Sequence, residues 1–237
     1  MPLGSFRLNS ISAVAAAAAG ARASAATYTV QSGTPAFQTF SFKFGTASRT
    51  YAGGQYSDID VNPTDTNFYF TYDKNWTIEW WMFSTTNTFS TVAAYIVRPG
   101  STAANFSIQT NTGVSGGLKL TIASTDVITW TQASATWQHF ALVNTYTSGG
   151  SSTLRLYREG TQLGSNVTFS NTTATRTTRI GTQNTLSPAT SFRFDEVRIS
   201  NIARYSSSFT APTAAFTNDA NTLALFHFDS TLTDDTA

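Results

Sequence analysis

The sequence predicts an all-β protein, a two-sheet antiparallel β-sandwich carried on a short Ala-rich N-terminal arm. Short runs of alternating apolar and polar residues fill most of the chain, clusters of Gly, Pro, Asn, Asp and Ser separate them, and no helical period of comparable length appears. Aromatic residues make up 14% of the chain and charged residues only 11%, so Thr, Ser, Asn and Gln must form most of the surface. The 237 residues suffice for one large sandwich.

The arm is predicted over residues 1–27, and the sandwich over residues 28–237. Ser10 or Ser12 could cap a helix in the arm, but a lone helix of this length is marginal in water and needs a surface to dock on. The apolar side chains expected to anchor the arm are Phe6, Leu8, Ile11 and Val14. The alternative is a secretory signal, because a weakly apolar stretch ends at an A-x-A-like site at residues 23–25.

The strands of the sandwich are predicted from alternation, which is typical of antiparallel sheets with one wet face. The clearest runs are Phe40-Phe42-Phe44, Ile59-Val61, Trp76-Ile78-Trp80-Met82, Val92-Ala94-Ile96, Phe106-Ile108, Leu118-Leu120-Ile122, Val127 to Trp130, Trp137 to Val143, Leu154-Leu156, Phe192-Phe194-Val197-Ile199 and Leu223-Leu225-Phe226-Phe228. Between Tyr157 and Leu163 the sequence predicts a hairpin whose tight turn places Gly160 near positive φ.

Charge and cysteine content exclude several classes of function. The net charge is +1, from 14 basic and 13 acidic residues spread along the chain, so no footprint for a nucleic-acid backbone exists. The chain has no Cys, which rules out disulfides and Cys-ligated zinc. The sequence contains no run of roughly 18 strongly apolar residues, the length that a helix needs to span a bilayer.

Four segments in order resemble laminin-G-like, concanavalin A-like domains over roughly residues 38–228. They are NWTIEWW at 75–81, TWQHFALV at 136–143, LRLYREG at 154–160 and FDEVRIS at 194–200. Further on, ARY at 203–205, FTAPT at 209–213 and LFHFD at 225–229 resemble the ending of laminin-G-like modules on bacteriophage virion proteins. The resemblance implies a concanavalin A-like jelly roll, a fold that hosts lectins, adhesion modules, hydrolases and particle components.

A catalytic constellation is missing from the sequence. Glycoside hydrolysis normally needs two carboxyl groups across the scissile bond, and the chain has only three Glu: Glu79, Glu159 and Glu196. The E-x-D-x-(x)-E strand motif of laminarinase-like enzymes is absent, since Trp80, Trp81, Met82 and Phe83 follow Glu79. No nucleophile elbow and no zinc-protease motif occurs. The sequence therefore favours a non-enzymatic protein, and an atypical glycoside hydrolase is a less favoured alternative.

A ligand surface is predicted at Glu79 and Trp81, which share one face of their strand with Thr77 and Phe83. A carboxylate beside an aromatic ring suits a sugar, whose C–H faces stack on rings while its hydroxyls need fixed partners. The structural alternative is that Trp81 packs under a loop and Glu79 pairs with an Arg on the next strand.

A structural calcium ion is the one cofactor that the resemblance makes possible, and no cofactor is required. The resemblance implies that Asp195 could help to hold the ion, and Asp58 and Asp60 would share one face of their strand. The alternative is that Asp195 caps a loop or pairs with Arg193 or Arg198.

These features predict a non-enzymatic structural or adhesive component of a bacteriophage particle, either a capsid decoration or a tail-associated protein. The arm would dock on other virion proteins, and the sandwich would project from the virion surface and could bind host surface polysaccharide. Several copies, or a homo-oligomer, are expected because weak contacts gain strength through avidity. The alternative is a secreted, free carbohydrate-binding lectin.

Overall fold

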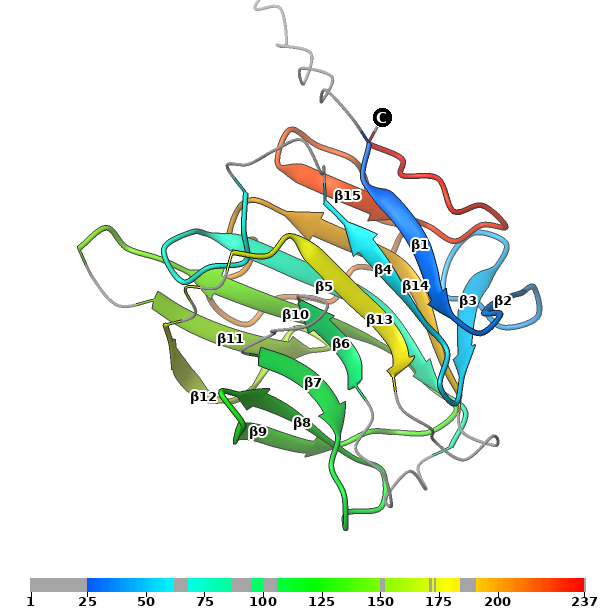
Figure 1. Ribbon diagram of the computed structural model, residues 1–237, viewed down its shortest axis with the longest axis horizontal. Coiled ribbons are helices and arrows are strands. Elements are labelled where there is room, and N and C mark those ends of the chain that lie inside the picture. The colour runs from blue at the N-terminus through cyan, green and yellow to red at the C-terminus, as the bar shows by residue number, and fades with distance from the viewer. Residues whose placement is uncertain are drawn as a thin grey trace, which may run out of the picture.

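The computed structural model describes residues 25–61, 68–86, 95–99, 106–149, 152–170, 172, 174–183 and 191–236. Figure 1 shows two β-sheets stacked face to face. The seven-stranded sheet has the order β1 (Thr27–Ser32), β4 (Tyr56–Asp60), β13 (Thr177–Gln183), β6 (Tyr95–Pro99), β7 (Phe106–Thr110), β8 (Gly117–Ile122) and β9 (Thr125–Thr131). All its strand pairs are antiparallel.

The eight-stranded sheet has the order β12 (Thr161–Phe169), β11 (Ser152–Arg158), β10 (Trp137–Thr145), β5 (Trp76–Ser84), β14 (Ser191–Ser200), β3 (Ser48–Ala52) and β2 (Ala36–Gln38), and β15 (Thr222–Phe226) pairs with β14. These pairs are antiparallel too. The predicted all-β sandwich is confirmed. The predicted anchoring residues Phe6, Leu8, Ile11 and Val14 lie outside the described residues, as do Val92 and Ala94.

Large aromatic side chains fill the space between the sheets. Trp76 stacks on Phe106 of the facing sheet with ring centroids 5.4 Å apart, and Trp80 stacks on Phe140 at 5.7 Å. Full burial of a side chain of this kind contributes about 1.5–3 kcal/mol. The face of β5 that carries Trp76, Ile78, Trp80 and Met82 therefore belongs to the core.

Strand β5 lies between β10 and β14 in its sheet, and it is buried on both faces, since eight of its nine residues are buried. Its sequence alternates only from Trp76 to Trp80 and is then continuously apolar to Phe83, whereas a strand with one solvated face would alternate throughout. Something must therefore cover the outer face of the eight-stranded sheet over β5.

The predicted strand through Phe40, Phe42 and Phe44 is wrong. These residues lie in the loop between β2 and β3, where Phe40 is 77% exposed and Phe42 is 37% exposed. Backbone amides of this loop donate to the side-chain carboxylates of Asp195 and Asp229 instead of to a neighbouring strand. Alternation of apolar residues alone therefore does not distinguish such a loop from a β-strand.

The predicted hairpin between β11 and β12 is confirmed. Glu159 has φ of +50° and Gly160 has φ of +76°, and these two residues alone join the strands. Two positive φ values in a two-residue loop match the twist of antiparallel strands.

The start of β1 is fixed to the C-terminal segment. The backbone N–H of Ala26 donates to a carboxylate oxygen of Asp234 at 2.7 Å, and Asp234 also accepts from the backbone of Leu225 at 2.9 Å. Figure 1 accordingly places the C-terminal end of the chain beside the start of β1. The chain thus enters the sandwich at a defined point just before Thr27.

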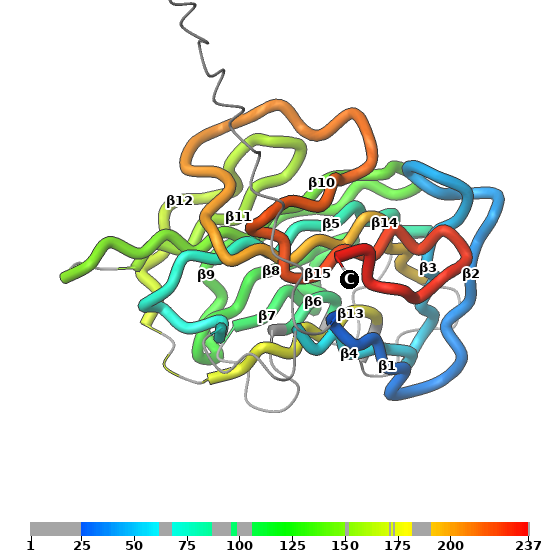
Figure 2. The backbone as a smooth tube through the Cα atoms, turned by 90° about the horizontal axis from the view of Figure 1, so that it is seen from above, coloured from blue at the N-terminus to red at the C-terminus, as the bar shows by residue number. Residues whose placement is uncertain are grey.

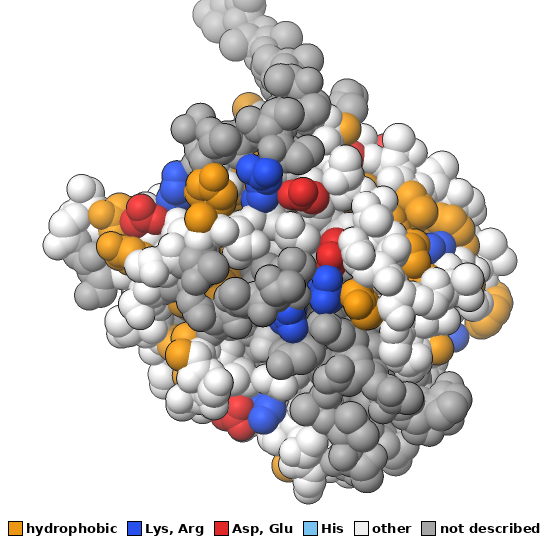
Figure 3. Space-filling view, viewed as in Figure 1, with side chains coloured by type: hydrophobic (Ala, Val, Ile, Leu, Met, Phe, Trp, Pro, Cys, Tyr) orange, Lys and Arg blue, Asp and Glu red, His pale blue; other side chains and the backbone are white. Residues whose placement is uncertain are grey.

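The visible surface is mostly uncharged. In Figure 3, Lys, Arg, Asp and Glu side chains are scattered over this face, and hydrophobic side chains gather at the edge where Figure 1 places β2 and β3. Within the described ranges, no helix is long and apolar enough to cross a membrane.

Candidate functional site

The outer face of the eight-stranded sheet is covered in part by residues 201–221, which we call the strap. In Figure 2 this orange segment arches over the part of the sheet formed by β10 and β11. Its residues Ala203, Tyr205 and Phe209 pack on the outer side chains of β10 and β11, which include Tyr157. Tyr205 and Phe209 stack on each other with ring centroids 3.6 Å apart. The strap thus supplies the cover that β5 and its neighbours need.

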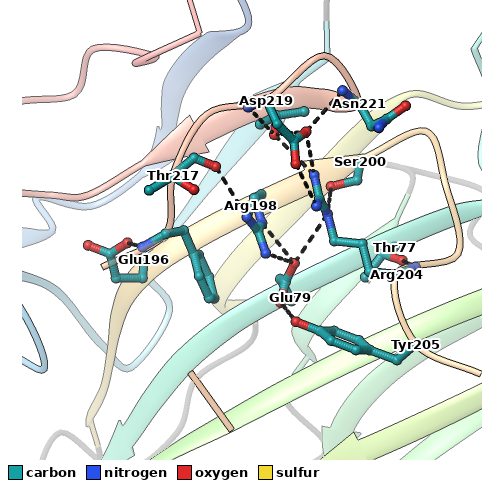
Figure 4. A network of polar contacts seen from close by, with 12 residues as sticks. Thr77, Glu79, Glu196, Arg198, Ser200, Arg204, Tyr205, Thr217, Asp219 and Asn221 are labelled. Carbon is teal, nitrogen blue, oxygen red and sulfur yellow. Dashed lines mark hydrogen bonds and ion pairs between the residues drawn. The ribbon is translucent and has the colours of Figure 1, made fainter. Parts of the chain in front are cut away.

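Glu79 lies beneath the strap at the centre of a polar network (Figure 4). Its side chain is fully buried, and Oε1 accepts from Nε of Arg198 on the adjacent β14 at 2.8 Å. Oε2 accepts from the hydroxyl of Tyr205 at 2.8 Å, and Nε2 of His139 lies 3.3 Å from it. Burial alone would raise the pKa of Glu79, but the hydrogen bond with His139 and the charge of Arg198 outweigh burial and hold the pKa below its usual value. Glu79 is therefore an ionised carboxylate with all its partners inside the protein.

The strap is also bound to itself and to β5 by Arg204. Its guanidinium donates two hydrogen bonds to Asp219, of 2.8 and 2.9 Å, and its backbone N–H donates to the hydroxyl of Thr77 at 2.9 Å. The hydrogen bonds from Arg204 lower the pKa of Asp219 well below its usual range. Nε of Arg204 also lies 3.6 Å from Oε1 of Glu79. One network therefore joins both ends of the strap to the sheet.

Trp81 is buried too, with 2% of its surface exposed. It packs with Phe216 of the strap, with Leu225 of β15 and against Phe44 of the loop between β2 and β3. Neither Trp81 nor Glu79 reaches solvent in this arrangement. Both residues are therefore placed as the alternative to a ligand surface describes: Trp81 packs beneath a loop, and Glu79 pairs with an Arg on the next strand.

The other two Glu side chains are engaged as well. Glu196 is buried and accepts from the backbone N–H of Phe216 at 2.7 Å, and its second oxygen lies 2.7 Å from Nδ1 of His227. Glu159, at the hairpin tip, accepts from the backbone N–H of His139. No Glu side chain therefore faces another across an open cleft.

Asp195 binds backbone amides. One oxygen accepts from the N–H groups of Lys43 at 2.7 Å and Phe44 at 3.2 Å, and the other accepts from that of Glu196 at 3.0 Å. Burial raises its pKa to about 8, and the nearby carboxylates of Glu196 and Asp229 add to the rise. This environment suits a loop-capping carboxyl better than a calcium ligand.

Asp58 and Asp60 of β4 are paired with arginines at the neighbouring strand of the same seven-stranded sheet, Arg179 of β13 and Arg176 directly before it. Asp58 forms two hydrogen bonds with Arg179, of 2.7 and 2.8 Å, and Asp60 lies 3.4 Å from Arg176. Within the part of the chain that the structure describes, no three His, Asp or Glu side chains converge as a metal site. A calcium ion stays a prediction.

Beyond the strap, the same sheet face presents a more open region, which we call the aromatic surface and define by Phe40, Lys43, Phe83, Trp137 and Arg193. Phe40 is exposed and the other four side chains are half-buried. Phe83 and Trp137 lie on adjacent strands with ring centroids 5.6 Å apart, and Arg193 lies across from Phe83 on β14. Continuing the face of Glu79 and Trp81 by one step along β5 leads to Phe83, so the sequence did hold a signal for part of this surface.

A hollow of about 350 Å³ opens at the opposite end of β5. It is lined by Phe68, Asp73, Lys74, Asn75, Tyr146, Asn201 and Leu223. The side-chain amide of the buried Asn144 donates to the carbonyls of Tyr72 at 3.1 Å and Lys74 at 2.7 Å, which fixes the loop that forms one wall. We call this hollow the rim pocket.

A family model described as the concanavalin A-like lectin/glucanases superfamily (Laminin_G_3) matches residues 52–210. The chain belongs to this family. The predicted laminin-G-like, concanavalin A-like domain is thereby confirmed, and no match to a curated protein was found.

Solved structures show the same fold at low identity. The receptor-binding domain of botulinum neurotoxin D matches with a TM-score of 0.58 at 11% identity, over 76% of this chain and 45% of that chain. The binding domain of botulinum neurotoxin DC in complex with rat synaptotagmin II matches with a TM-score of 0.55 at 12% identity, over 76% and 44%. A structure of botulinum neurotoxin type C, whose cell entry depends on interaction with two ganglioside molecules, matches with a TM-score of 0.56 at 12% identity. The match covers 76% of this chain and 44% of that chain. This chain thus spans less than half the length of these neighbours, and the likeness shows a lectin-like fold.

Proposed function

We propose that this chain is a non-catalytic structural and adhesive component of a bacteriophage particle, in which the arm docks on the particle and the sandwich projects outward. The observation that carries the non-catalytic part is the state of Glu79, which is buried beneath the strap and bound by Arg198, Tyr205 and His139. A glycosidase needs a carboxyl group that meets the glycosidic oxygen and a second one across the bond. Here the ion pairs and the strap occupy the space that a sugar would need.

The adhesive part is supported by the family and by the aromatic surface. Lectin-like sandwiches use a sheet face or a loop rim to bind partners, and exposed aromatic rings beside charged groups are common in such sites. The particle location rests on the resemblance of residues 203–229 to laminin-G-like modules of bacteriophage virion proteins.

The arm can be tested by truncation. Since Ala26 is tied to Asp234, the deletion should end at residue 24 and leave the start of β1 intact. We expect the shortened chain to keep its thermal unfolding midpoint and to be lost from assembled particles, measured by quantitative mass spectrometry of purified virions. Incorporation equal to that of the full chain would refute the anchoring role.

The non-catalytic role is tested by incubating the full chain with polysaccharides and measuring released reducing ends. We expect none above the level of a heat-unfolded sample. Release that disappears in Glu79→Gln would establish hydrolysis instead.

A free carbohydrate-binding lectin is the second candidate. The botulinum neurotoxin neighbours favour it, because they include a receptor-binding domain, a domain in complex with rat synaptotagmin II and a toxin whose cell entry depends on two ganglioside molecules. A glycan array run with and without calcium separates the two roles. Glycan binding by a chain that never enters particles would support the free lectin, and calcium dependence would establish the predicted ion.

A further inference from the structure

We propose that the aromatic surface binds an acidic polysaccharide, whose carboxylates pair with Arg193 and Lys43 and whose sugar rings stack on Phe40, Phe83 and Trp137. This inference rests on the proposed adhesive role and names the class of ligand and the residues that bind it.

The charge of Arg193 is not paired with any Asp or Glu of the described residues. Its guanidinium carbon lies 4.8 Å from the ring centroid of Phe83 and 5.4 Å from that of Phe40. Among the described residues its Nε is buried without a hydrogen-bond partner, and burial lowers the pKa of the side chain. Only this nitrogen is shielded from water, and the rest of the side chain is half-buried. A bidentate carboxylate is the partner that the planar guanidinium fits best.

Lys43 supplies a second cation on the same face. Its ammonium lies 3.9 Å from the ring centroid of Trp81 and 5.4 Å from that of Phe44. Trp81 and Phe83 lie on the same face of β5 two residues apart, so the two cations occupy neighbouring positions. Within the described ranges neither cation forms an ion pair with an Asp or Glu.

The loop between β2 and β3 that carries Phe40 and Lys43 is held in place before any ligand arrives. Asp195 accepts from the backbone of Lys43, and Asp229 accepts from the backbone of Thr46 and of Ala47. A loop that is already ordered loses less conformational entropy when it binds. The exposure of Phe40, at 77%, therefore belongs to a fixed position on the surface.

The aromatic rings select a sugar over other anions. Phe40, Phe83 and Trp137 offer ring faces and edges to the C–H groups of a pyranose, which a free phosphate or a carboxylate ion lacks. Two cations on a chain of net charge +1 are too few for a nucleic-acid backbone, which needs several phosphate contacts. A neutral glycan would leave Arg193 without an anion. An acidic polysaccharide offers carboxylates to the two cations and sugar rings to the aromatic side chains.

The test uses the full chain and immobilised polygalacturonate, with the same polymer after reduction of its carboxyl groups as the neutral control. We expect binding to the acidic polymer that weakens with added salt, and at least tenfold weaker binding to the reduced polymer. Dextran sulfate is run in parallel, because stronger binding there would assign the anion as a sulfate rather than a carboxylate. Poly-glutamate that binds as well as polygalacturonate would overturn the choice of a sugar.

Variants locate the site. Arg193→Gln should weaken binding about tenfold or more, because it removes a charge-assisted hydrogen-bond donor. Phe40→Ala, in an exposed loop where folding is not at risk, should weaken it several-fold. Lys119→Gln removes one positive charge from the other sheet, where Lys119 pairs with Asp126 at 3.0 Å, and it should bind like the parent.

Tyr146→Ala in the rim pocket is the matched aromatic control. Loss of binding with Tyr146→Ala but not with Phe40→Ala or Arg193→Gln would move the site to the rim pocket and overturn the inference. No binding to any acidic polymer, while arm-dependent incorporation into particles persists, would also overturn it and leave the proposed particle role standing.

Discussion

The substitution Glu79→Gln tests whether the buried network holds the strap on the sheet. It removes the negative charge but keeps the size of the side chain, so Arg198 loses its ion pair while it remains 8% exposed. Removing one partner of a buried ion pair costs about 3–5 kcal/mol, because the other charge stays buried without compensation. Since the Gln carbonyl can still accept from Tyr205 or Arg198, we expect the lower end of that range, about 3 kcal/mol.

That loss has a measurable size in thermal unfolding. For a domain of 150–250 residues, 1 kcal/mol moves the unfolding midpoint by about 2–4 °C, so Glu79→Gln should lower Tm by about 6–12 °C. Circular dichroism at pH 7 measures it. Asp126→Asn is the matched control, because Asp126 pairs with Lys119 at the surface with 41% of its side chain exposed, and we expect a change within about 0.5 kcal/mol.

The pH dependence of the difference provides a second check. The folded pKa of Glu79 lies below its value in the unfolded chain, so its contribution is present above pH 4.5 and is lost as the pH falls through the folded pKa. A protonated Glu resembles Gln, and the gap between parent and variant should therefore narrow at low pH.

Trypsin offers a local readout, since Arg204 lies within the strap. Opening of the strap in Glu79→Gln should speed cleavage after Arg204 more than it changes global unfolding. A variant that melts with the parent and resists trypsin equally would refute the idea that these ion pairs hold the strap.

Three other changes test neighbouring features. Gly160→Ala should destabilise the chain by at least about 1–2 kcal/mol in urea unfolding, because an added Cβ would lie 1.8 Å from the carbonyl oxygen of Phe209 and Gly160 has φ of +76°. Asp195→Asn should flatten the fall in stability between about pH 4 and pH 8: the folded carboxyl titrates near pH 8, above its unfolded value, so the parent binds more protons folded than unfolded and loses stability as pH rises. A parent whose Tm is constant over this range would contradict that assignment. Asn144→Ala should cost about 2–3 kcal/mol by removing the side-chain donor of the carbonyls of Tyr72 and Lys74 beside the rim pocket, measured against Asn218→Ala at the surface.

The strands that the sequence predicts best are those whose alternating side chains enter the core. The runs through Trp76, Phe140 and Leu154 form β5, β10 and β11. An apolar residue at every second position is a local signal, because it places these side chains on the face of the strand that enters the core. Strands β1, β3 and β13 gave little signal, since Thr, Ser and Arg fill them. Their place in the sheet is set by the ladder with neighbours far away in sequence.

The strap was predicted only as a stretch that resembles the ending of related modules. Its role as a cover depends on Tyr205 and Phe209 meeting the outer face of β10 and β11, more than 45 residues earlier in the chain. No local period encodes such a contact. The aromatic surface escapes sequence prediction for a similar reason, because Phe40 lies in a loop whose apolar alternation predicts a strand.

The pairing of Glu79 with Arg198 depends on a single irregularity in β14. Phe192 and Phe194 point into the core, but so do Val197 and Ile199, which means that the side-chain alternation shifts by one residue between them. Glu196, with φ of +52°, lies at that shift. Without the bulge, Arg198 would point into the apolar core, and Glu79 would lose its shorter ion pair and keep only the 3.6 Å contact with Arg204. With it, Arg193 and Arg198 lie on the same outer face, so one strand serves both the closed network under the strap and the aromatic surface beside it.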